Sequence, residues 1–336
     1  MECGENQMPK QQPLELYLGP TLDLDTVFNK EEHWGEPSIG FDGSLYFLRI
    51  VNEEAYSEVI LTNSTQIPFD FQVAILTNHQ VEVFTVKDQT KAFDFVQPLP
   101  KGRLIMVDAR VSYYGNGVFD QNASVFKRGG NEFQPIREFL IGDGISHLYT
   151  TEKGSIWTGY FDEGIFGSHG WGDPWLKGSP PPIGEPGVIQ WDSKGSQLFA
   201  NDQVYIAECY SMNVVSDHEV WFYYYDSFKI VHLKDGVFKG YDPFLEGASD
   251  LVVNNTHLML REDAVFYIYE IEEESLKQIA IVHLVNEKEK KMGVANTSFD
   301  VRGDRMVFLS QHYLYDVRLH EMVEMVKERM EGWDGL

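Results

Sequence analysis

The segment GDGISHLYTTEKGSIWTGYFDEGIFGSHGWG, residues 142–172, is the clearest copy of a unit that recurs less regularly along the chain. It predicts a strand, a tight turn centred on Lys153 and Gly154, a second strand rich in aromatic residues, and then a long glycine-rich loop. Glycine suits such a turn because, without a Cβ atom, it adopts a positive φ at no steric cost. The segment therefore predicts one hairpin of a repeated all-β unit.

A small or polar residue followed by an apolar run marks a similar turn at about 50-residue intervals along the chain. These turn residues are Gly43, Gly102, Gly154, Asp217, Asn255 and Gly303. The runs that flank each turn predict a meander of four strands. Four-stranded units at this period are typical of β-propellers, in which each sheet packs on its neighbours. The 336 residues hold about six periods, so the sequence predicts a six-bladed β-propeller formed by one domain, residues 14–319.

The two ends of the chain depart from this pattern. Residues 1–13 are expected to be disordered. The last unit lacks an outer strand, so LELYL, residues 14–18, is predicted to complete it and to bring the termini together. Residues 320–336 place apolar residues near helical spacing, which predicts a short amphipathic helix packed on the outside of the ring. A methionine-rich docking surface is the alternative interpretation of this helix.

Charge and composition limit the choice of partners. The chain has 52 acidic and 27 basic side chains, and its formal net charge is −25. Nucleic acid and anionic membrane surfaces both require clustered Lys and Arg, so neither is expected as a partner. The sequence shows no signal peptide and no apolar run of membrane-spanning length, and its two cysteines do not suggest a disulfide framework. These features predict a cytoplasmic protein.

The segment GDGISHLYTTEKGSIWTGYFDEGIFG resembles the repeat of two-component-regulator propellers, in which an isoleucine-led strand, a D/E-x-x-G turn and an I-W-x-G strand lead to a glycine. The segments VQPLPKGRLIMVDAR, WTGYFDEGIFG and WFYYYDSF are also similar to a bacterial group of six-bladed propellers, mostly of unassigned function. The resemblance covers residues 95–230 and implies the fold much more than a function.

The segment TTEKGSIW also resembles the Asp-box of sialidases, with Glu152 in the place of the aspartate. The Asp-box joins the two outer strands of a blade, whereas this segment joins the predicted first and second strands. The resemblance therefore implies no sialidase activity.

Ligands of propellers bind at one mouth of the central channel. Two kinds of loop form this mouth: those that join the fourth strand of one blade to the first strand of the next blade, and those that join the second strand of a blade to its third. One of the latter loops, residues 160–187, spans 28 residues and holds seven Gly and five Pro. Loops of this length in compact domains are usually functional or disordered, and aromatic residues argue against disorder here. We expect a lid over the mouth, whose Trp171 and Trp175 either stack on a planar ligand such as a sugar or pack down to hold the lid.

The residues expected to bind a ligand at this mouth are charged or aromatic and lie in or beside predicted strand ends and loops. They are Arg49, Arg110, His147, Tyr160, Trp171, Trp175 and Tyr225. Arg49 and Arg110, with Arg261, either face one anionic group together or form separate salt bridges with local carboxylates. His147 is either a hydrogen-bonded structural residue or a base or ligand.

Four carboxylates, Asp143, Asp162, Glu163 and Asp226, are predicted to converge at the same mouth. Oxygen ligands suit Ca²⁺ or Mg²⁺, and lactonase-type six-bladed propellers use such an arrangement of carboxylates. Chance proximity in an acidic chain is the alternative. No GxSxG, P-loop, HExxH or paired CxxC motif occurs. Two functions follow: a non-catalytic propeller that binds a small molecule or protein under the 160–187 loop, or a hydrolase or lactonase assisted by a divalent metal.

Overall fold

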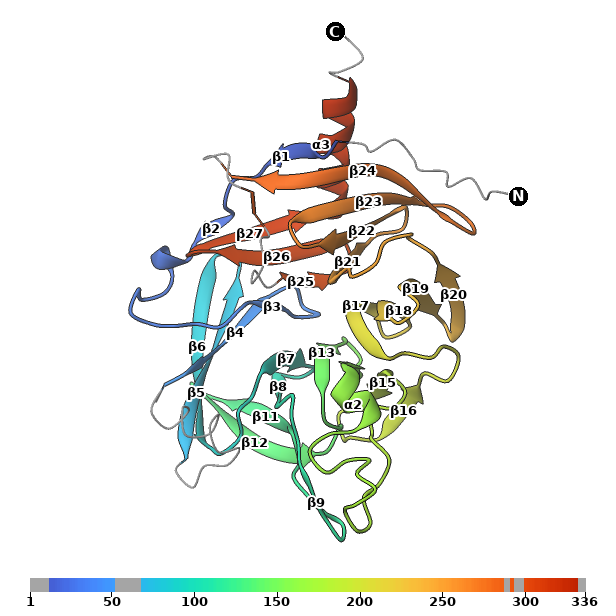
Figure 1. Ribbon diagram of the computed structural model, residues 1–336. Helices are drawn as coiled ribbons and strands as arrows, with labels where there is room; N and C mark the ends of the chain where they lie inside the picture. The colour runs from blue at the N-terminus through green and yellow to red at the C-terminus, as the bar shows by residue number, and fades with distance from the viewer. Residues whose placement is uncertain (1–11, 52–67, 287–290, 293–298, 332–336) are drawn as a thin grey trace, which may run out of the picture.

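The structure, a computed structural model, describes residues 12–51, 68–286, 291–292 and 299–331. Within these residues the strands form five sheets of four or more strands and one two-stranded hairpin. The sheets stand around a common centre, and their first strands face it (Figure 1). The helical elements of the same residues are the short η1 (Leu24–Thr26) and α2 (Asp162–Phe166) and the longer α3 (Leu319–Glu331). The prediction of an all-β, propeller-like fold is confirmed.

The largest sheet contains two successive antiparallel meanders. Its strands are β3 (Ser38–Ile39), β4 (Leu45–Ile50), β5 (Phe69–Thr77) and β6 (Gln80–Gln89), then β7 (Phe95–Leu99), β8 (Arg103–Val107), β11 (Ala123–Gly129) and β12 (Glu132–Phe139). The two meanders join through a parallel pairing of Thr85 in β6 with Glu132 in β12. A hairpin of β9 (Tyr113–Gly115) and β10 (Val118–Phe119), which the sequence analysis did not predict, is inserted between β8 and β11.

The remaining sheets follow in chain order, each built around one meander. Their strands are β13 (Ile145–Thr150), β14 (Ile156–Tyr160), β15 (Val188–Trp191) and β16 (Gln197–Ala200); β17 (Glu208–Ser216), β18 (Glu219–Tyr225), β19 (Lys229–Lys234) and β20 (Val237–Tyr241); β21 (Asp250–Val253), β22 (His257–Glu262), β23 (Val265–Ile271) and β24 (Leu276–Val285); and β25 (Phe299–Arg302), β26 (Arg305–Ser310) and β27 (Tyr313–Arg318). The strand runs predicted from the sequence overlap these strands. Gly154, at the turn between β13 and β14, has φ +90°, as its predicted role requires.

The N-terminal segment joins two different sheets. β1 (Leu14–Tyr17) pairs in parallel with β24, whereas β2 (Leu22–Asp23) pairs antiparallel with β27. The prediction that residues 14–18 complete the last meander was therefore wrong. Leu16 is buried in a cluster with Leu284 of β24 and Met322 of α3, which explains why β1 lies there.

Helix α3, Leu319–Glu331, overlaps the helix predicted at residues 320–336, of which residues 332–336 lie outside the described part of the chain. Residues 1–11 of the segment predicted to be disordered also lie outside it. Its buried residues are Leu319, Met322, Val323 and Val326. All four pack against β1 and the last two sheets as part of one cluster. The apolar face of the helix is therefore part of the core.

Apolar clusters lie between neighbouring meanders rather than within single ones. Phe71 of β5 shares a cluster with Phe126 of the next meander, and Phe47 of β4 shares one with Leu314 of β27. Since the first and last meanders share a core, the sheets close into a ring. Burial on both faces also explains why strands such as LIMV, residues 104–107, are continuously apolar.

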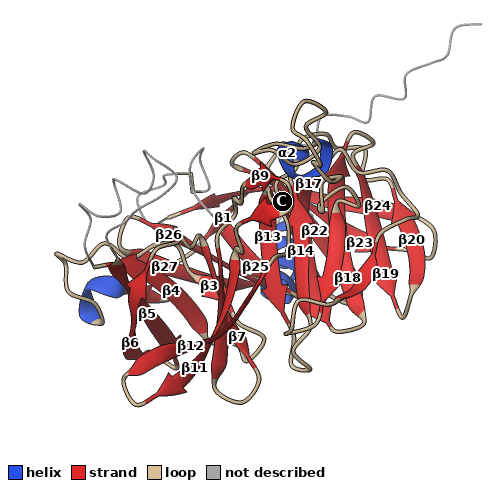
Figure 2. Cartoon of the chain, turned by 90° about the horizontal axis from the view of Figure 1, so that it is seen from below, coloured by secondary structure: helices blue, strands red, loops and turns tan. Residues whose placement is uncertain are grey.

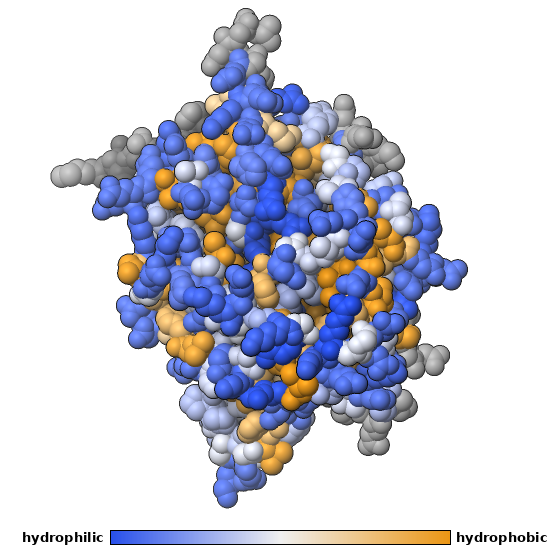
Figure 3. Space-filling model, turned by 180° about the vertical axis from the view of Figure 1, so that it is seen from behind, coloured by the Kyte–Doolittle hydropathy of each residue, from blue (hydrophilic) through white to orange (hydrophobic). Residues whose placement is uncertain are grey.

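The outer surface carries the excess charge of the chain. Hydrophilic residues cover most of the face opposite to that of Figure 1, with separate hydrophobic areas between them (Figure 3). None of the helices in the described residues has the length and apolar character that a membrane crossing needs. α2 and β9 lie on one side of the ring (Figure 2).

Candidate ligand-binding site

The first strands of the meanders surround one central cavity of about 310 Å³. β3, β7, β13, β17, β21 and β25 all contribute lining residues, and most of these residues lie near the N-terminal ends of their strands. In a propeller this is the end at which the fourth strand of one meander connects to the first of the next. The cavity therefore lies at the mouth where ligand binding was expected.

Four carboxylates line the cavity: Glu36, Asp94, Asp250 and Asp300. Asp250 is 9% exposed, and its Oδ2 lies 2.5 Å from Nε of Arg261. Asp300 accepts hydrogen bonds from the Tyr149 hydroxyl at 3.0 Å and from the backbone amide of Ile39. These two carboxylates are therefore held in place by protein partners.

Glu36 and Asp94 are less constrained. Both side chains are exposed, and neither has an ion-pair partner among the described residues. Asp94 accepts a hydrogen bond from the backbone amide of Ala109 at 2.7 Å. Because Arg261 is already paired with Asp250, negative charge remains available in this cavity.

The protein around these carboxylates disfavours their charged form. Burial raises the pKa of Asp300 to about 6 and also raises the pKa of Asp250. Partial desolvation by the cavity walls raises the pKa of Glu36 and Asp94, although both residues keep contact with solvent. The nearby Arg261 guanidinium opposes this rise at Asp250. A cation bound in the cavity would stabilise the ionised carboxylates, since an opposite charge at close range favours the charged form.

None of these four residues was chosen by the sequence analysis. Each lies within two residues of the start of a first strand: Glu36 before β3, Asp94 before β7, Asp250 in β21 and Asp300 in β25. A carboxylate that recurs at the start of the first strand of several meanders is a sequence signal for this cavity. It becomes visible only when the strand starts are known to within a residue or two.

Aromatic side chains and one imidazole complete the cavity wall: Phe95, Tyr149, Phe299 and His147. The His147 Nε2–H donates to the backbone carbonyl of Cys209 at 3.2 Å, and burial lowers the pKa of His147 to about 4, so the ring is neutral at pH 7. The Arg261 guanidinium lies 4.3 Å from the centre of the Phe299 ring. This wall thus already holds one cation against an aromatic face.

Arg302, two residues beyond Asp300 in β25, ties the first strands together. Its Nε donates to the carbonyl of Ile39 at 3.0 Å, and Nη1 donates to the carbonyls of Thr150 at 3.1 Å and Val214 at 3.4 Å. Nη2 donates to Oε1 of Gln97 at 3.2 Å. One guanidinium therefore connects β25 to β3, β13, β17 and β7 and fixes the spacing of the cavity walls.

The three arginines expected near the mouth each have their own carboxylate partners. The pairs are Arg49 with Glu32 at 3.0 Å, Arg110 with Asp143 at 3.1 Å and Glu163 at 2.5 Å, and Arg261 with Asp250 at 2.5 Å. Of the two arrangements considered for these arginines, the structure has the separate salt bridges.

The carboxylates predicted to hold a metal are only partly brought together. Asp143 and Glu163 meet at Arg110, which supplies the positive charge that both need. Asp162 begins α2, and Asp226 directly follows β18. No three of the four, all of which lie in described segments, place their oxygens within 4.8 Å of one another. The metal site at these residues stays a prediction.

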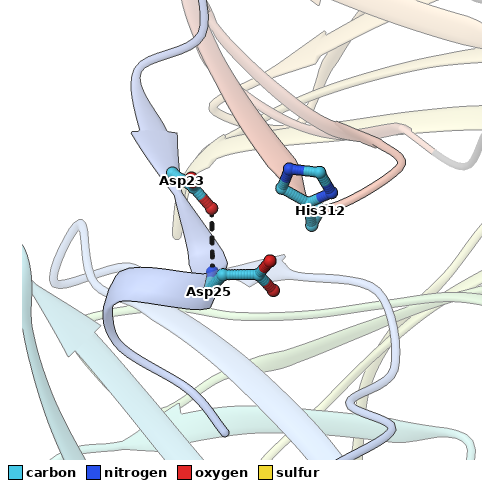
Figure 4. Close-up of side chains that lie close together, drawn as sticks. All are labelled: Asp23, Asp25 and His312. Carbon is cyan, nitrogen blue, oxygen red and sulfur yellow. Dashed lines mark hydrogen bonds between the residues drawn. The ribbon is translucent and has the colours of Figure 1, made fainter. Parts of the chain in front are cut away.

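Another group of potential metal ligands was not found from the sequence. Asp23, Asp25 and His312 place ligand atoms within 4.8 Å of one another, where η1 faces the turn between β26 and β27 (Figure 4). Asp23 accepts a hydrogen bond from the Asp25 amide at 3.0 Å, and the Lys30 ammonium lies 3.0 Å from Asp25. Both carboxylates thus have partners in the protein. Their distance from His312 in the chain explains why no sequence motif marked them.

The 160–187 loop packs against the β9–β10 hairpin. The Trp171 Nε1–H donates to the carbonyl of Val111 at 2.8 Å, and the Tyr113 amide donates to the carbonyl of His169 at 2.8 Å. The Tyr113 hydroxyl donates to the carbonyl of Gly178 at 2.7 Å. Although the whole loop is described, none of its residues lines the central cavity, so the loop does not form the expected lid over that cavity.

The aromatic residues proposed from the sequence as ligand contacts have different environments. Tyr160 is fully buried, and its hydroxyl donates to the carbonyl of Ile141. Trp171 is 4% exposed and packs down, whereas Trp175 is 93% exposed. Tyr225 is half-exposed and stacks on Tyr210, with ring centres 5.9 Å apart. Of the predicted ligand-binding residues, His147 lines the central cavity.

No protein-family model matches the chain, and no curated protein is significantly similar to it. Among solved structures, it is similar to virginiamycin B lyase from Staphylococcus aureus, with 10% identity, a TM-score of 0.48, and coverage of 86% of this chain and 80% of that chain. It is also similar to a putative 6-phosphogluconolactonase from Bacteroides uniformis, with 11% identity, a TM-score of 0.44, and coverage of 83% of this chain and 82% of that chain. A third similar structure is the WD40 domain of Toxoplasma gondii coronin, with 10% identity, a TM-score of 0.43, and coverage of 91% of this chain and 83% of that chain. At these identities and scores, the neighbours carry no argument about a ligand or reaction.

Proposed function

We propose that this protein is a six-bladed propeller that binds a small organic cation in its central cavity. The eight-stranded sheet counts as two blades in this proposal, and each of the other large sheets counts as one. The observation that carries the proposal is the composition of the cavity wall. First strands from around the ring contribute four carboxylates and three aromatic side chains to a space of about 310 Å³.

An ammonium group matches this wall in charge and hydrogen bonding. It carries three donors and no acceptor, while Glu36 and Asp94 offer acceptors that have no ion-pair partner among the described residues. Hydrogen bonds between charged groups are about twice as strong as neutral ones, and aromatic faces attract cations. The neutral His147 adds no competing positive charge. The net charge of −25 attracts cations at longer range.

The alternative of a metal-assisted hydrolase is less well supported by this cavity. Such chemistry needs several ligand oxygens converging on one ion. No three of the four cavity carboxylates, all in described segments, lie within 4.8 Å of one another by their ligand atoms. Separated carboxylates around an aromatic-lined space fit an organic cation better than a bare metal ion.

Isothermal titration calorimetry with 1,4-diaminobutane at pH 7.5, with 1,4-butanediol as the neutral counterpart, tests the proposal. We expect saturable binding of the diamine alone. Glu36→Gln and Asp94→Asn should each weaken it by about tenfold or more, because a hydrogen bond to a charged group contributes about 1.5–3 kcal/mol. Glu152→Gln, the same change at an exposed residue in the β13–β14 turn, is the matched control and should have no effect. Absence of diamine binding, equal binding of the diol, or equal affinity in all variants would reject the proposal.

A further inference from the structure

A second cavity, of about 660 Å³, lies between the 160–187 loop and the segment 201–206 that follows β16. It shares no lining residue with the central cavity. One wall includes the end of α2 and the consecutive prolines Pro180–Pro182, and the other includes Val204, Tyr205 and Ile206. Most of its lining residues are therefore prolines, aromatic residues or branched apolar residues.

Large apolar groups in this cavity are open to solvent. Phe166 is 57% exposed and Tyr205 is 65% exposed, and both line the cavity. Trp175, at 93% exposure, directly follows the lining residue Pro174. Exposed aromatic residues gathered in one place mark recognition surfaces, and Trp and Tyr dominate the binding energy of many protein interfaces.

The charge of this cavity has one sign. Its charged lining residues are Asp173 and Glu185, and it has no Lys, Arg or His in its wall, all of which lies in described segments. The Glu185 carboxylate makes no hydrogen bond or ion pair within the described part of the chain. The cavity thus offers a free carboxylate next to apolar rings.

The neutral polar side chains of the wall are already used by the protein. The Ser179 hydroxyl donates to the carbonyl of Gly170 at 2.8 Å, and the Asn201 amide group donates to the carbonyls of Pro186 and Val204, both at 2.8 Å. A sugar, whose many hydroxyls need free donors and acceptors, would find few partners here. A basic side chain, with a long aliphatic stem and a charged end, would find both apolar walls and a carboxylate.

The loop wall is fixed before any ligand arrives. The Gly172 amide donates to the carbonyl of Pro180 at 2.9 Å, and a Cβ atom on Gly184 would lie 2.5 Å from the carbonyl oxygen of Gly164. Such close backbone contacts, together with the buried Trp171, hold the loop in one shape. Binding to a preformed surface avoids the entropy cost of ordering a loop.

We propose that this cavity binds a peptide segment of a partner protein in which an Arg or Lys is flanked by apolar residues. The aliphatic part of the basic side chain packs on the rings of Phe166 and Tyr205, and its charged end pairs with Glu185. The net charge of −25 favours such a basic partner over an acidic one. This inference does not depend on the function proposed for the central cavity.

Selection of a random 12-residue peptide library displayed on phage against the immobilised full-length chain tests this inference. We expect enriched peptides to contain Arg or Lys beside apolar residues. Fluorescence anisotropy with the synthesised consensus peptide should show about tenfold weaker binding to Tyr205→Ala and to Glu185→Gln, and weaker binding of a peptide with Gln in place of the basic residue. Phe244→Ala removes an 89% exposed aromatic ring outside this cavity and should leave binding unchanged.

Three outcomes would overturn the inference. The first is a selection without enrichment of basic, apolar peptides. The second is a consensus peptide that binds the Tyr205 and Glu185 variants as tightly as the wild type, while all variants keep the wild-type melting temperature. The third is binding to a glycan array that Tyr205→Ala abolishes, which would assign the cavity to a sugar.

Discussion

The two cavities of this molecule are built from different kinds of chain. First strands from around the ring supply the walls of the central cavity, and Arg302 holds these strands together. The other cavity is formed by one 28-residue loop and the short segment 201–206. The central cavity therefore depends on the ring as a whole, whereas the loop cavity depends on local anchors such as Trp171. Changes to these two supports should have separable effects.

Arg302→Met should cause the largest loss of stability, about 3–5 kcal/mol, as expected when one partner of a buried charged network is removed. The change leaves the carbonyls of Ile39, Thr150 and Val214 without this donor and removes a positive charge near Asp300. Urea unfolding measures the free energy of unfolding. Binding of the diamine should be lost together with stability.

Arg318→Met is the matched control for this prediction. The Arg318 side chain is 44% exposed and pairs with Asp304 at 2.8 Å, so its loss should cost less than about 1 kcal/mol. If Arg302→Met were no more destabilising than Arg318→Met, the hydrogen bonds of Arg302 would not be what holds the first strands in place.

The central region also shows how far sequence alone could lead. The meanders were predictable because apolar runs such as LIMV, residues 104–107, fill strands that are buried between two sheets, and because glycines such as Gly154 mark the turns. The pairing of β2 with β27 was not predictable, since a strand of two residues carries no periodicity. The tie formed by Arg302 depends on contacts among strands far apart in the chain, for which no local pattern exists.

The loop region was recognised from its length and composition, but the environments of its residues were not. Trp171 and Trp175 are four residues apart and equally aromatic, yet one is 4% exposed and the other 93%. The difference arises from the β9–β10 hairpin, which packs against Trp171 and was not predicted. The Asn116–Gly117 pair, both at positive φ, is the sequence signal for this hairpin, and it was overlooked. Without the hairpin, the two tryptophans could not be told apart.

Trp171→Phe should destabilise the loop by about 1–2 kcal/mol, because it removes the hydrogen bond to the Val111 carbonyl and part of a buried ring system. Hydrogen exchange should accelerate in residues 160–187 while β25 remains protected, and the diamine should bind as before. Trp175→Phe, the same change at an exposed position, should alter the free energy of unfolding by less than about 0.5 kcal/mol. Weaker diamine binding in Trp171→Phe would show that the two cavities are coupled.

The smallest expected effect, counted for each pH unit, concerns the charge of Asp300 in the central cavity. Burial raises the pKa of this carboxyl to about 6 in the folded state, above its unfolded value, so the folded state holds its proton more tightly. The resulting stabilisation is present at low pH and is lost as the pH rises through about 6. Burial lowers the pKa of His147 to about 4, which acts in the opposite sense over part of this range, so the quantity to measure is the difference from Asp300→Asn.

Between pH 4 and pH 7, the wild type should lose stability relative to Asp300→Asn, by less than about 1 kcal/mol for each pH unit. Asparagine has a single acceptor oxygen and so keeps one of the two hydrogen bonds that Asp300 accepts, from the Tyr149 hydroxyl and the Ile39 amide. Because the loss of the other bond does not vary with pH, the pH dependence of the difference isolates the charge. Urea unfolding at several pH values, with and without the diamine, measures it. Because a bound cation stabilises the ionised carboxylate, the diamine should reduce the loss, whereas the basic peptide of the loop cavity should not. If the stability difference between the wild type and Asp300→Asn did not change with pH, or if the diamine and the peptide changed it equally, the charge of Asp300 would have no part in cation binding by the central cavity.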